Sequence, residues 1–161
     1  MKLYHGSDVL VSQPDLAKGK PYKDFGRGFY LSDTREQALE MASRIVNRID
    51  RGLKPIVSTF EFDESAMTDG SLYVKRFDTY SEEWAEFVLH NRDRKIPQPI
   101  HNFDIVYGPI ADDSVVRQMR RFELGDITLN ELMRELKYPQ KITFQYFFGS
   151  EKALERLHFL C

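Results

Sequence analysis

The sequence is poor in cysteine, because its single thiol belongs to the last residue, Cys161. One thiol cannot form a disulfide framework or a Cys-x-x-Cys metal or redox pair, so the sequence excludes both classes of protein. Long apolar runs are also lacking. No stretch approaches the ~20 residues of a membrane span, and no apolar run follows the charge near the N-terminus. We therefore expect an unexported, cytoplasmic protein that does not enter a membrane.

The sequence lacks an excess of charge of either sign, since 23 lysines and arginines face 25 aspartates and glutamates for a formal charge of -2. This balance excludes a global basic field that would hold nucleic acid by counterion release. No internal repeat, low-complexity tract or linker rich in glycine and proline divides the chain. With 161 residues it is long enough to bury one hydrophobic core, so we expect a single domain over 1–161.

Strand patterns and helix patterns alternate along the chain. Short β-branched or aromatic runs between turn residues predict strands at 3–5, 28–31, 56–62, 103–107 and 142–148. Apolar spacing and capping residues predict helices over 33–50, after Ser81, over 114–122, after Thr128 and after Ser150. The last helix is expected to include Leu157. The alternation predicts an α+β fold in which helices interrupt a mostly antiparallel sheet.

The histidines and acids show no spacing that is typical of a metal site. His90 and His158 are expected to be ordinary surface or packing residues. His101 precedes a predicted strand, with Asp104 beyond it and two aspartates at 112–113, but no His-Glu-x-x-His or Asp-x-Asp-x-Asp-Gly pattern is present. The P-loop and the Gly-x-Ser-x-Gly motif are missing as well. We expect no metal.

Two segments combine glycine with groups that can bind a ligand. In the first, a short apolar strand ends in His5, Gly6 and Ser7. A glycine lets the backbone approach a ligand closely, while the imidazole and the hydroxyl can hydrogen-bond it. In the second, at 23–32, two glycines in three residues lead into an aromatic strand that contains Tyr30. Each segment alone is explained by a glycine turn beside core aromatics, but their order and separation are informative.

Together the two segments resemble the NAD-binding half of the ADP-ribosyltransferase superfamily, in the His-Tyr branch that includes diphtheria toxin and the poly(ADP-ribose) polymerases. The resemblance implies a split, mostly antiparallel sheet with flanking and inserted helices. It implies that His5 contacts the nicotinamide ribose, the backbone of Gly6 holds the nicotinamide amide, and Tyr30 stacks on the nicotinamide ring. Ser7 and Gly28 would shape the pocket. The chain is also similar to a bacterial family of unknown function grouped with this superfamily. The similarity covers 23–32, 84–88 with 91–92, 103–106 with 108–113, and 145–148 with 153–154.

The third catalytic position of this branch is commonly a glutamate on a late strand. By resemblance the matching residue is Gln145, whose amide oxygen can accept a hydrogen bond from the ribose but which carries no charge and cannot act as a general base. Asp104 is a second candidate for the ribose or acceptor side. Arg27, with Arg35 and Lys23, lies near the pocket in sequence and is a candidate for binding the pyrophosphate.

The resemblance implies a mono-ADP-ribosyltransferase, which takes NAD as substrate, transfers ADP-ribose to a macromolecular acceptor and releases nicotinamide. Polymer elongation is not expected with Gln145. Two alternatives stay open: a noncatalytic module that binds NAD or ADP-ribose, and an NAD glycohydrolase in which water replaces the acceptor. The acceptor, protein or nucleic acid, and any cognate antitoxin or regulatory partner also stay open. Basic clusters at 92–95 and 117–121 suit a phosphate backbone, an acidic protein face or plain solvent contact. We expect acceptor specificity to be built over 109–138.

Overall fold

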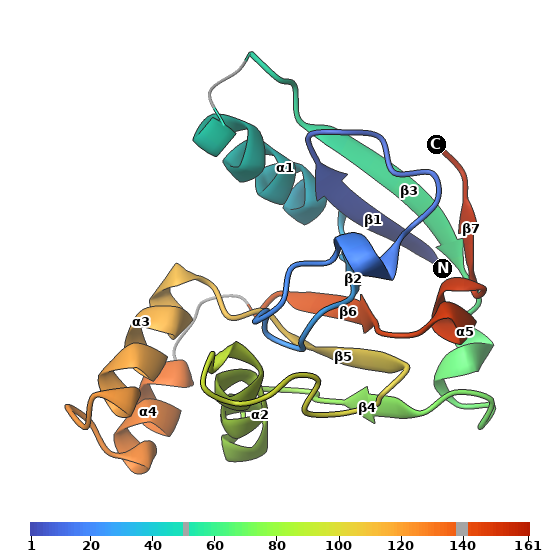
Figure 1. Cartoon of the computed structure of the whole chain (residues 1–161). Coiled ribbons are helices and arrows are strands. Elements are labelled where there is room, and N and C mark those ends of the chain that lie inside the picture. Colours follow the sequence, from blue (N-terminus) through green and yellow to red (C-terminus); the bar gives the residue numbers. More distant parts are fainter. Residues whose placement is uncertain (50–51, 138–141) are drawn as a thin grey trace.

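The computed structural model describes residues 1–49, 52–137 and 142–161, and Figure 1 shows helices around two β-sheets. The first sheet has three antiparallel strands in the order β1-β3-β7, which are Lys2–Ser7, Ile56–Phe62 and Leu157–Phe159. The second sheet has four strands in the order β2-β6-β5-β4, which are Phe29–Leu31, Phe144–Phe148, Ile105–Pro109 and Val74–Arg76. Only the β4–β5 pair is parallel in these two sheets. The arrangement confirms the predicted α+β fold.

The described part of the chain contains the α-helices α1 to α5, which are Arg35–Ile49, Glu82–Arg92, Asp113–Glu123, Leu129–Leu136 and Glu151–Leu154. Two 3-10 helices, η1 (Leu16–Lys18) and η2 (Glu64–Met67), lie in connecting segments. The expected cap of α2 is present, because the Ser81 hydroxyl accepts the Trp84 N–H at 3.1 Å. The helix predicted over 33–50 ends at Ile49, and Asp50 lies outside the described residues. None of the described helices is both long and apolar enough to cross a membrane.

Three features of the elements differ from the sequence prediction. Strands β4 and β7 are three residues long and are not predicted, because pairing with β5 and β3 stabilises them rather than a local pattern. Helix α5 ends before Leu157, which belongs to β7. Strand β5 begins at Ile105, since Asp104 instead makes backbone bonds with Tyr73 and Gly149.

The second sheet is covered on both faces. Alternate residues of β6 show this, because Tyr146 and Phe148 lie in the core between the two sheets, whereas Phe147 lies in the core shared with α2, α3 and α4. Trp84 of α2 is fully buried in the latter core, and its indole N–H donates to the Pro109 carbonyl at 3.1 Å. Burial of so large a side chain contributes roughly 3 kcal/mol, which fixes α2 against the end of β5.

Helix α1 covers the first sheet on the face opposite the second sheet (Figure 1). A Cβ added at Gly6 would lie 1.8 Å from the Ala38 carbonyl oxygen, so a glycine is required for the helix to approach β1 this closely. The small buried residues Ala38 and Ala42 belong to the packed face of α1. The first glycine segment therefore has a packing role of its own.

Candidate functional site

The two sheets meet along β1 and β2. Tyr4 and Ser32 exchange two backbone hydrogen bonds of 2.8 Å and form an antiparallel bridge. If the pairing continued, Gly6 would face Tyr30, but within the described residues no such bridge forms and the strands diverge. This junction brings together His5, Gly6 and Tyr30, the residues that the resemblance places around nicotinamide.

The backbone N–H and C=O of Gly6 point away from β3. Met1 and Phe62 exchange two backbone bonds, of 2.9 and 2.8 Å, so every second pair along this ladder is bonded and Gly6 falls in a nonbonded pair. Tyr4 has the same parity and bonds Ser32 through both groups. Gly6 is buried, yet across the described residues no hydrogen bond reaches either of its backbone groups from outside the ladder. A primary amide, which is donor and acceptor at once, matches such a pair.

His5 is held in one orientation by the neighbouring strand. Its Nδ1 lies 2.8 Å from the Tyr30 carbonyl oxygen, and since a carbonyl only accepts, Nδ1 carries the proton. The ring packs on Phe29 with 4.4 Å between centroids. Burial lowers the pKa of His5 below 6.5 and outweighs the opposing effect of the bond to Tyr30, so the imidazole is neutral at pH 7. Nε2 therefore has a lone pair that can accept a hydrogen bond from a ligand hydroxyl.

The Tyr30 hydroxyl is used inside the protein. It accepts the Phe25 N–H at 3.0 Å and donates to the Gly26 carbonyl at 2.7 Å, which fixes the loop before β2. Burial, and after it the charge of Asp24, raises the pKa of Tyr30 well above 10, so the phenol stays neutral. The ring meets Phe147 edge to face, with 5.3 Å between centroids. Because the side chain is only half-buried, part of its ring surface is left for a ligand.

Tyr30 and Gln145 project from the face of the second sheet that α2 covers. Tyr30 pairs with Phe147 across β2 and β6, so Gln145 is its diagonal neighbour on that face, about 7 Å away between Cβ atoms. The ring of His5 instead packs on Phe29, which belongs to the opposite face. The bond from His5 to the Tyr30 carbonyl links the two sides. A ligand that touches all three side chains must cross the edge of β2 at the junction.

Gln145 is bonded to a carboxylate that sequence reasoning missed, that of Asp24. Gln145 Nε2 donates to Asp24 Oδ2 at 3.0 Å, and the Ala111 N–H donates to the same oxygen at 3.2 Å. Arg92 Nη1 donates to Oδ1 at 3.0 Å, and the Asp24 side chain is only 15% exposed. Asp24 lies within the second glycine segment, but nothing local to 23–32 indicates contacts with positions 92, 111 and 145. Three distant segments, at positions 92, 111 and 145, therefore converge on the Asp24 carboxylate.

The comparison with protein families covers almost the whole chain. Residues 1–159 match the family described as protein of unknown function DUF3990. The chain belongs to the DUF3990 family. No curated protein matches it. Every residue of the junction lies within the matched region, and the chemistry of this DUF3990 domain depends on the groups that its site presents.

Asp104 of the DUF3990 domain lies apart from the junction. Its carboxylate accepts the Tyr73 N–H at 2.7 Å and the Ser150 hydroxyl. Gly108 is the residue of β5 that pairs with Gln145, so Asp104, four positions earlier, is about 13 Å away along the strand. The carboxylate therefore ties the starts of β4, β5 and α5 together and does not meet the other candidates.

The remaining candidates shape or border the site. A Cβ at Gly28 would lie 2.2 Å from a ring carbon of Phe147, so this glycine lets β2 pack against β6. The Ser7 hydroxyl donates to the Asp8 carboxylate at 3.2 Å. Arg27 is exposed and borders a cavity of about 810 Å³, whose lining does not include His5 or Tyr30.

Proposed function

We propose that this DUF3990 domain is an NAD-dependent mono-ADP-ribosyltransferase. The buried backbone of Gly6 carries the proposal, because its unpaired groups match the carboxamide of nicotinamide. The C=O can accept from the amide NH2, and the N–H can donate to the amide oxygen. Tyr30, on the strand across the gap, offers ring surface for the nicotinamide ring and supports the same assignment.

In the proposed reaction the bond between the ribose C1′ and nicotinamide N1 breaks, and its electron pair leaves with nicotinamide, which becomes neutral. An acceptor nucleophile forms the new bond to C1′ and gives up its proton to water or a nearby base. Positive charge develops on the ribose in the transition state. Groups that accept hydrogen bonds from the ribose hydroxyls and place negative charge nearby stabilise that transition state and accelerate the reaction. His5 Nε2 is suited to accept one such hydroxyl.

Asp24 can supply the negative charge that a glutamate at position 145 would carry. Because Gln145 Nε2 donates to Asp24, the amide oxygen Oε1 is the atom left to accept a ribose hydroxyl. The carboxylate lies one hydrogen bond behind that amide, and its ion pair with Arg92 reduces the negative charge without removing it. We assign Asp24 a positioning role, in which it orients Gln145 and supplies the charge that Gln145 lacks.

A noncatalytic module that binds NAD or ADP-ribose is the second candidate. The uncharged Gln145 favours it, since binding a dinucleotide needs the donors and acceptors at Gly6 and His5 but no general base. Both candidate functions therefore predict NAD binding, but only the transferase predicts that NAD is turned over.

The deciding experiment incubates the domain with NAD that carries label in its ADP-ribose, in a cell extract that supplies acceptors. Free nicotinamide and labelled macromolecule are then measured. Nicotinamide together with labelled macromolecule is the expected result. Nicotinamide with free ADP-ribose alone indicates an NAD glycohydrolase, and saturable NAD binding without any release of nicotinamide indicates the noncatalytic module.

His5→Ala tests the site directly. Loss of one hydrogen bond to the ligand should weaken NAD binding roughly tenfold in a calorimetric titration. His158→Ala is the matched control, because His158 is exposed on β7, in the same sheet but away from the junction. Equal affinities of the His5→Ala variant and the unaltered protein, with both folded by melting temperature, would contradict the assignment.

A further inference from the structure

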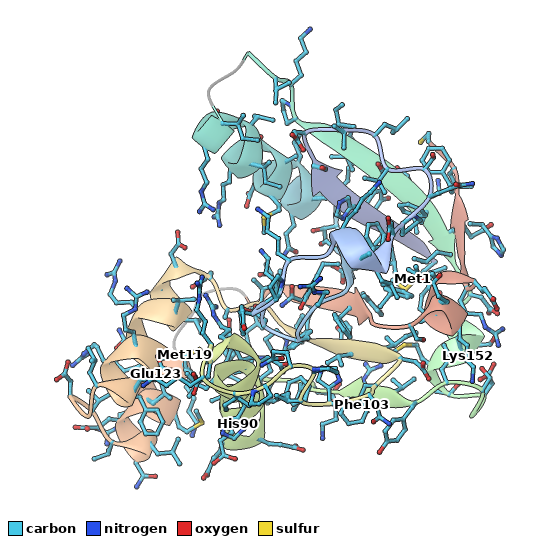
Figure 2. All side chains as sticks on the ribbon, in the orientation of Figure 1. Met1, His90, Phe103, Met119, Glu123 and Lys152 are labelled. Atoms are coloured by element: carbon cyan, nitrogen blue, oxygen red, sulfur yellow. The ribbon has the colours of Figure 1, made fainter. Side chains whose placement is uncertain are left out.

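A second cavity, of about 290 Å³, lies between the end of α2 and α3, and we term it the basic cleft. It is lined by Tyr22, Arg92, Arg94, Met119, Arg120 and Glu123, among others. Figure 2 shows Met119 and Glu123 along α3. The basic clusters at 92–95 and 117–121 are separate in sequence, yet each contributes to this one cleft. Apart from Arg92, which pairs with Asp24, none of these basic residues has a role in the proposed chemistry.

The basic cleft concentrates positive charge in a chain whose net charge is slightly negative. Its lining holds three guanidinium groups and one carboxylate, Glu123, while the whole chain carries -2. Arg92 shares an ion pair of 3.0 Å with Asp24, which uses one of its five N–H donors. Arg94 and Arg120 are exposed. An anionic ligand in the cleft would gain charge-assisted hydrogen bonds, for which phosphate and carboxylate are the best acceptors.

Tyr22 gives the basic cleft an aromatic wall in a strained backbone. Its φ of 59° lies in the left-handed region, which an aromatic residue rarely adopts. Such strain persists where the surrounding structure holds a residue in place, and it gathers at functional sites. The Arg94 guanidinium lies 5.6 Å from the ring centroid. An aromatic face beside arginines is the combination with which proteins hold the base and phosphate of a single-stranded nucleic acid.

We propose that the basic cleft binds a single-stranded nucleic acid through its phosphates, with one base against Tyr22. An acidic protein segment would also meet the arginines, but it would use neither the aromatic wall nor a cavity near the lower end of small-molecule sites, about 300 Å³. Arg92 links the cleft to Asp24 and so to Gln145. If the proposed transferase activity holds, the bound strand is placed to be the acceptor, and that last step rests on the proposed function.

Binding is tested without NAD, so that the result does not depend on turnover. Fluorescence anisotropy measures the Kd of a labelled single-stranded 12-mer, in DNA and RNA form, from 50 to 200 mM salt. About three phosphate contacts predict a slope of log Kd against log[salt] near 2, since each contact contributes ~0.7 for a single strand. Arg120→Gln should weaken binding roughly tenfold and lower the slope by about 0.7.

Arg117→Gln is the matched control for Arg120→Gln. Both arginines are exposed on α3, but Arg117 does not line the basic cleft, so its loss should leave the Kd within about twofold. Tyr22→Gly relieves the backbone strain and removes the ring, so the protein should be at least as stable while its binding weakens roughly tenfold. Both results together support the cleft as a nucleic-acid site.

Three outcomes would overturn the proposal. Equal weakening by the two arginine substitutions shows diffuse surface attraction rather than a site. Tighter binding of a labelled polyglutamate, again dependent on Arg120, assigns the cleft to an acidic protein. If neither oligonucleotide binds at 50 mM salt, nucleic acid is rejected as the ligand of the cleft. Because nicotinamide release from NAD is measured separately, each of these results leaves the proposed function standing, and its failure leaves the binding result intact.

Discussion

Neutralising Asp24 removes the negative charge on which three distant segments converge. Its two oxygens receive hydrogen bonds of 3.0, 3.2 and 3.0 Å from Arg92, Ala111 and Gln145. Bonds to a charged acceptor are worth about 1.5–3 kcal/mol and neutral ones about 0.5–1.5 kcal/mol. An asparagine amide has only one accepting oxygen, so Asp24→Asn can keep the bonds from Ala111 and Gln145 in neutral form, at a loss of about 1 kcal/mol each. It loses the Arg92 bond for about 1 kcal/mol more, because that guanidinium is 36% exposed and can bond water instead. We expect the free energy of unfolding to fall by about 3 kcal/mol. For a domain of this size Tm then falls by roughly 6–12 °C.

Urea denaturation measures this loss, and Asp78→Asn is its control. Asp78 pairs with Arg76 at 2.7 Å, a shorter contact than that of Asp24, but its side chain is 75% exposed against 15%. Because exposed ion pairs contribute about 1 kcal/mol or less, the control should lose less than that despite its shorter distance. If the two substitutions cost the same, burial does not decide the strength of the Asp24 contacts and the reasoning is refuted.

Exchanging the carboxylate and the amide between positions 24 and 145 separates the effect of the negative charge on turnover from the effect of the hydrogen bond on stability. Gln145→Glu alone sets two carboxylates against each other and should reduce both stability and nicotinamide release. In the double variant Asp24→Asn/Gln145→Glu, the introduced amide can donate to the introduced carboxylate, so turnover should recover above that of Asp24→Asn. A purely structural Asp24 would let stability recover while the rate of nicotinamide release stayed low.

Other predictions concern packing and pH. Gly6→Ala sets a methyl group 1.8 Å from the backbone oxygen of Ala38, and the overpacking should cost about 3 kcal/mol in urea denaturation; an unchanged midpoint would contradict the contact. Burial lowers the pKa of His5 and His101 below 6.5, so the unfolded chain binds more protons below that pH. Their contribution to stability is therefore complete above pH 6.5 and is lost as the pH falls through the folded pKa values, by up to about 1.4 kcal/mol per pH unit for each histidine. His101→Gln should flatten this dependence, and an equally steep curve would assign it to other groups.

Elements with a complete local signal could be predicted from the sequence, and those that depend on partners could not. Helix α4 has its reciprocal cap between Thr128 and Glu131, and α1 has its own apolar stripe. Strand β7 lacks such a signal, because its three residues are held by pairing with β3, which is distant in sequence. The site divides in the same way. His5 and Tyr30 lie in short glycine segments that can be recognised from the local sequence. The role of Asp24 depends instead on hydrogen bonds with partners 68, 87 and 121 positions away.

At Gly6 the strand register, and not the sequence motif alone, decides whether the backbone groups are available to a ligand. The contact with Ala38 already demands a glycine at this position, so its presence in the sequence does not by itself indicate a ligand. The parity of the β1–β3 ladder supplies the independent reason. A shift of the register by one residue would direct the backbone groups of Gly6 to β3 and leave those of His5 at the gap instead. The proposed amide contact at Gly6 therefore depends on the bridge between Tyr4 and Ser32, which fixes the register and ends where the unpaired groups begin.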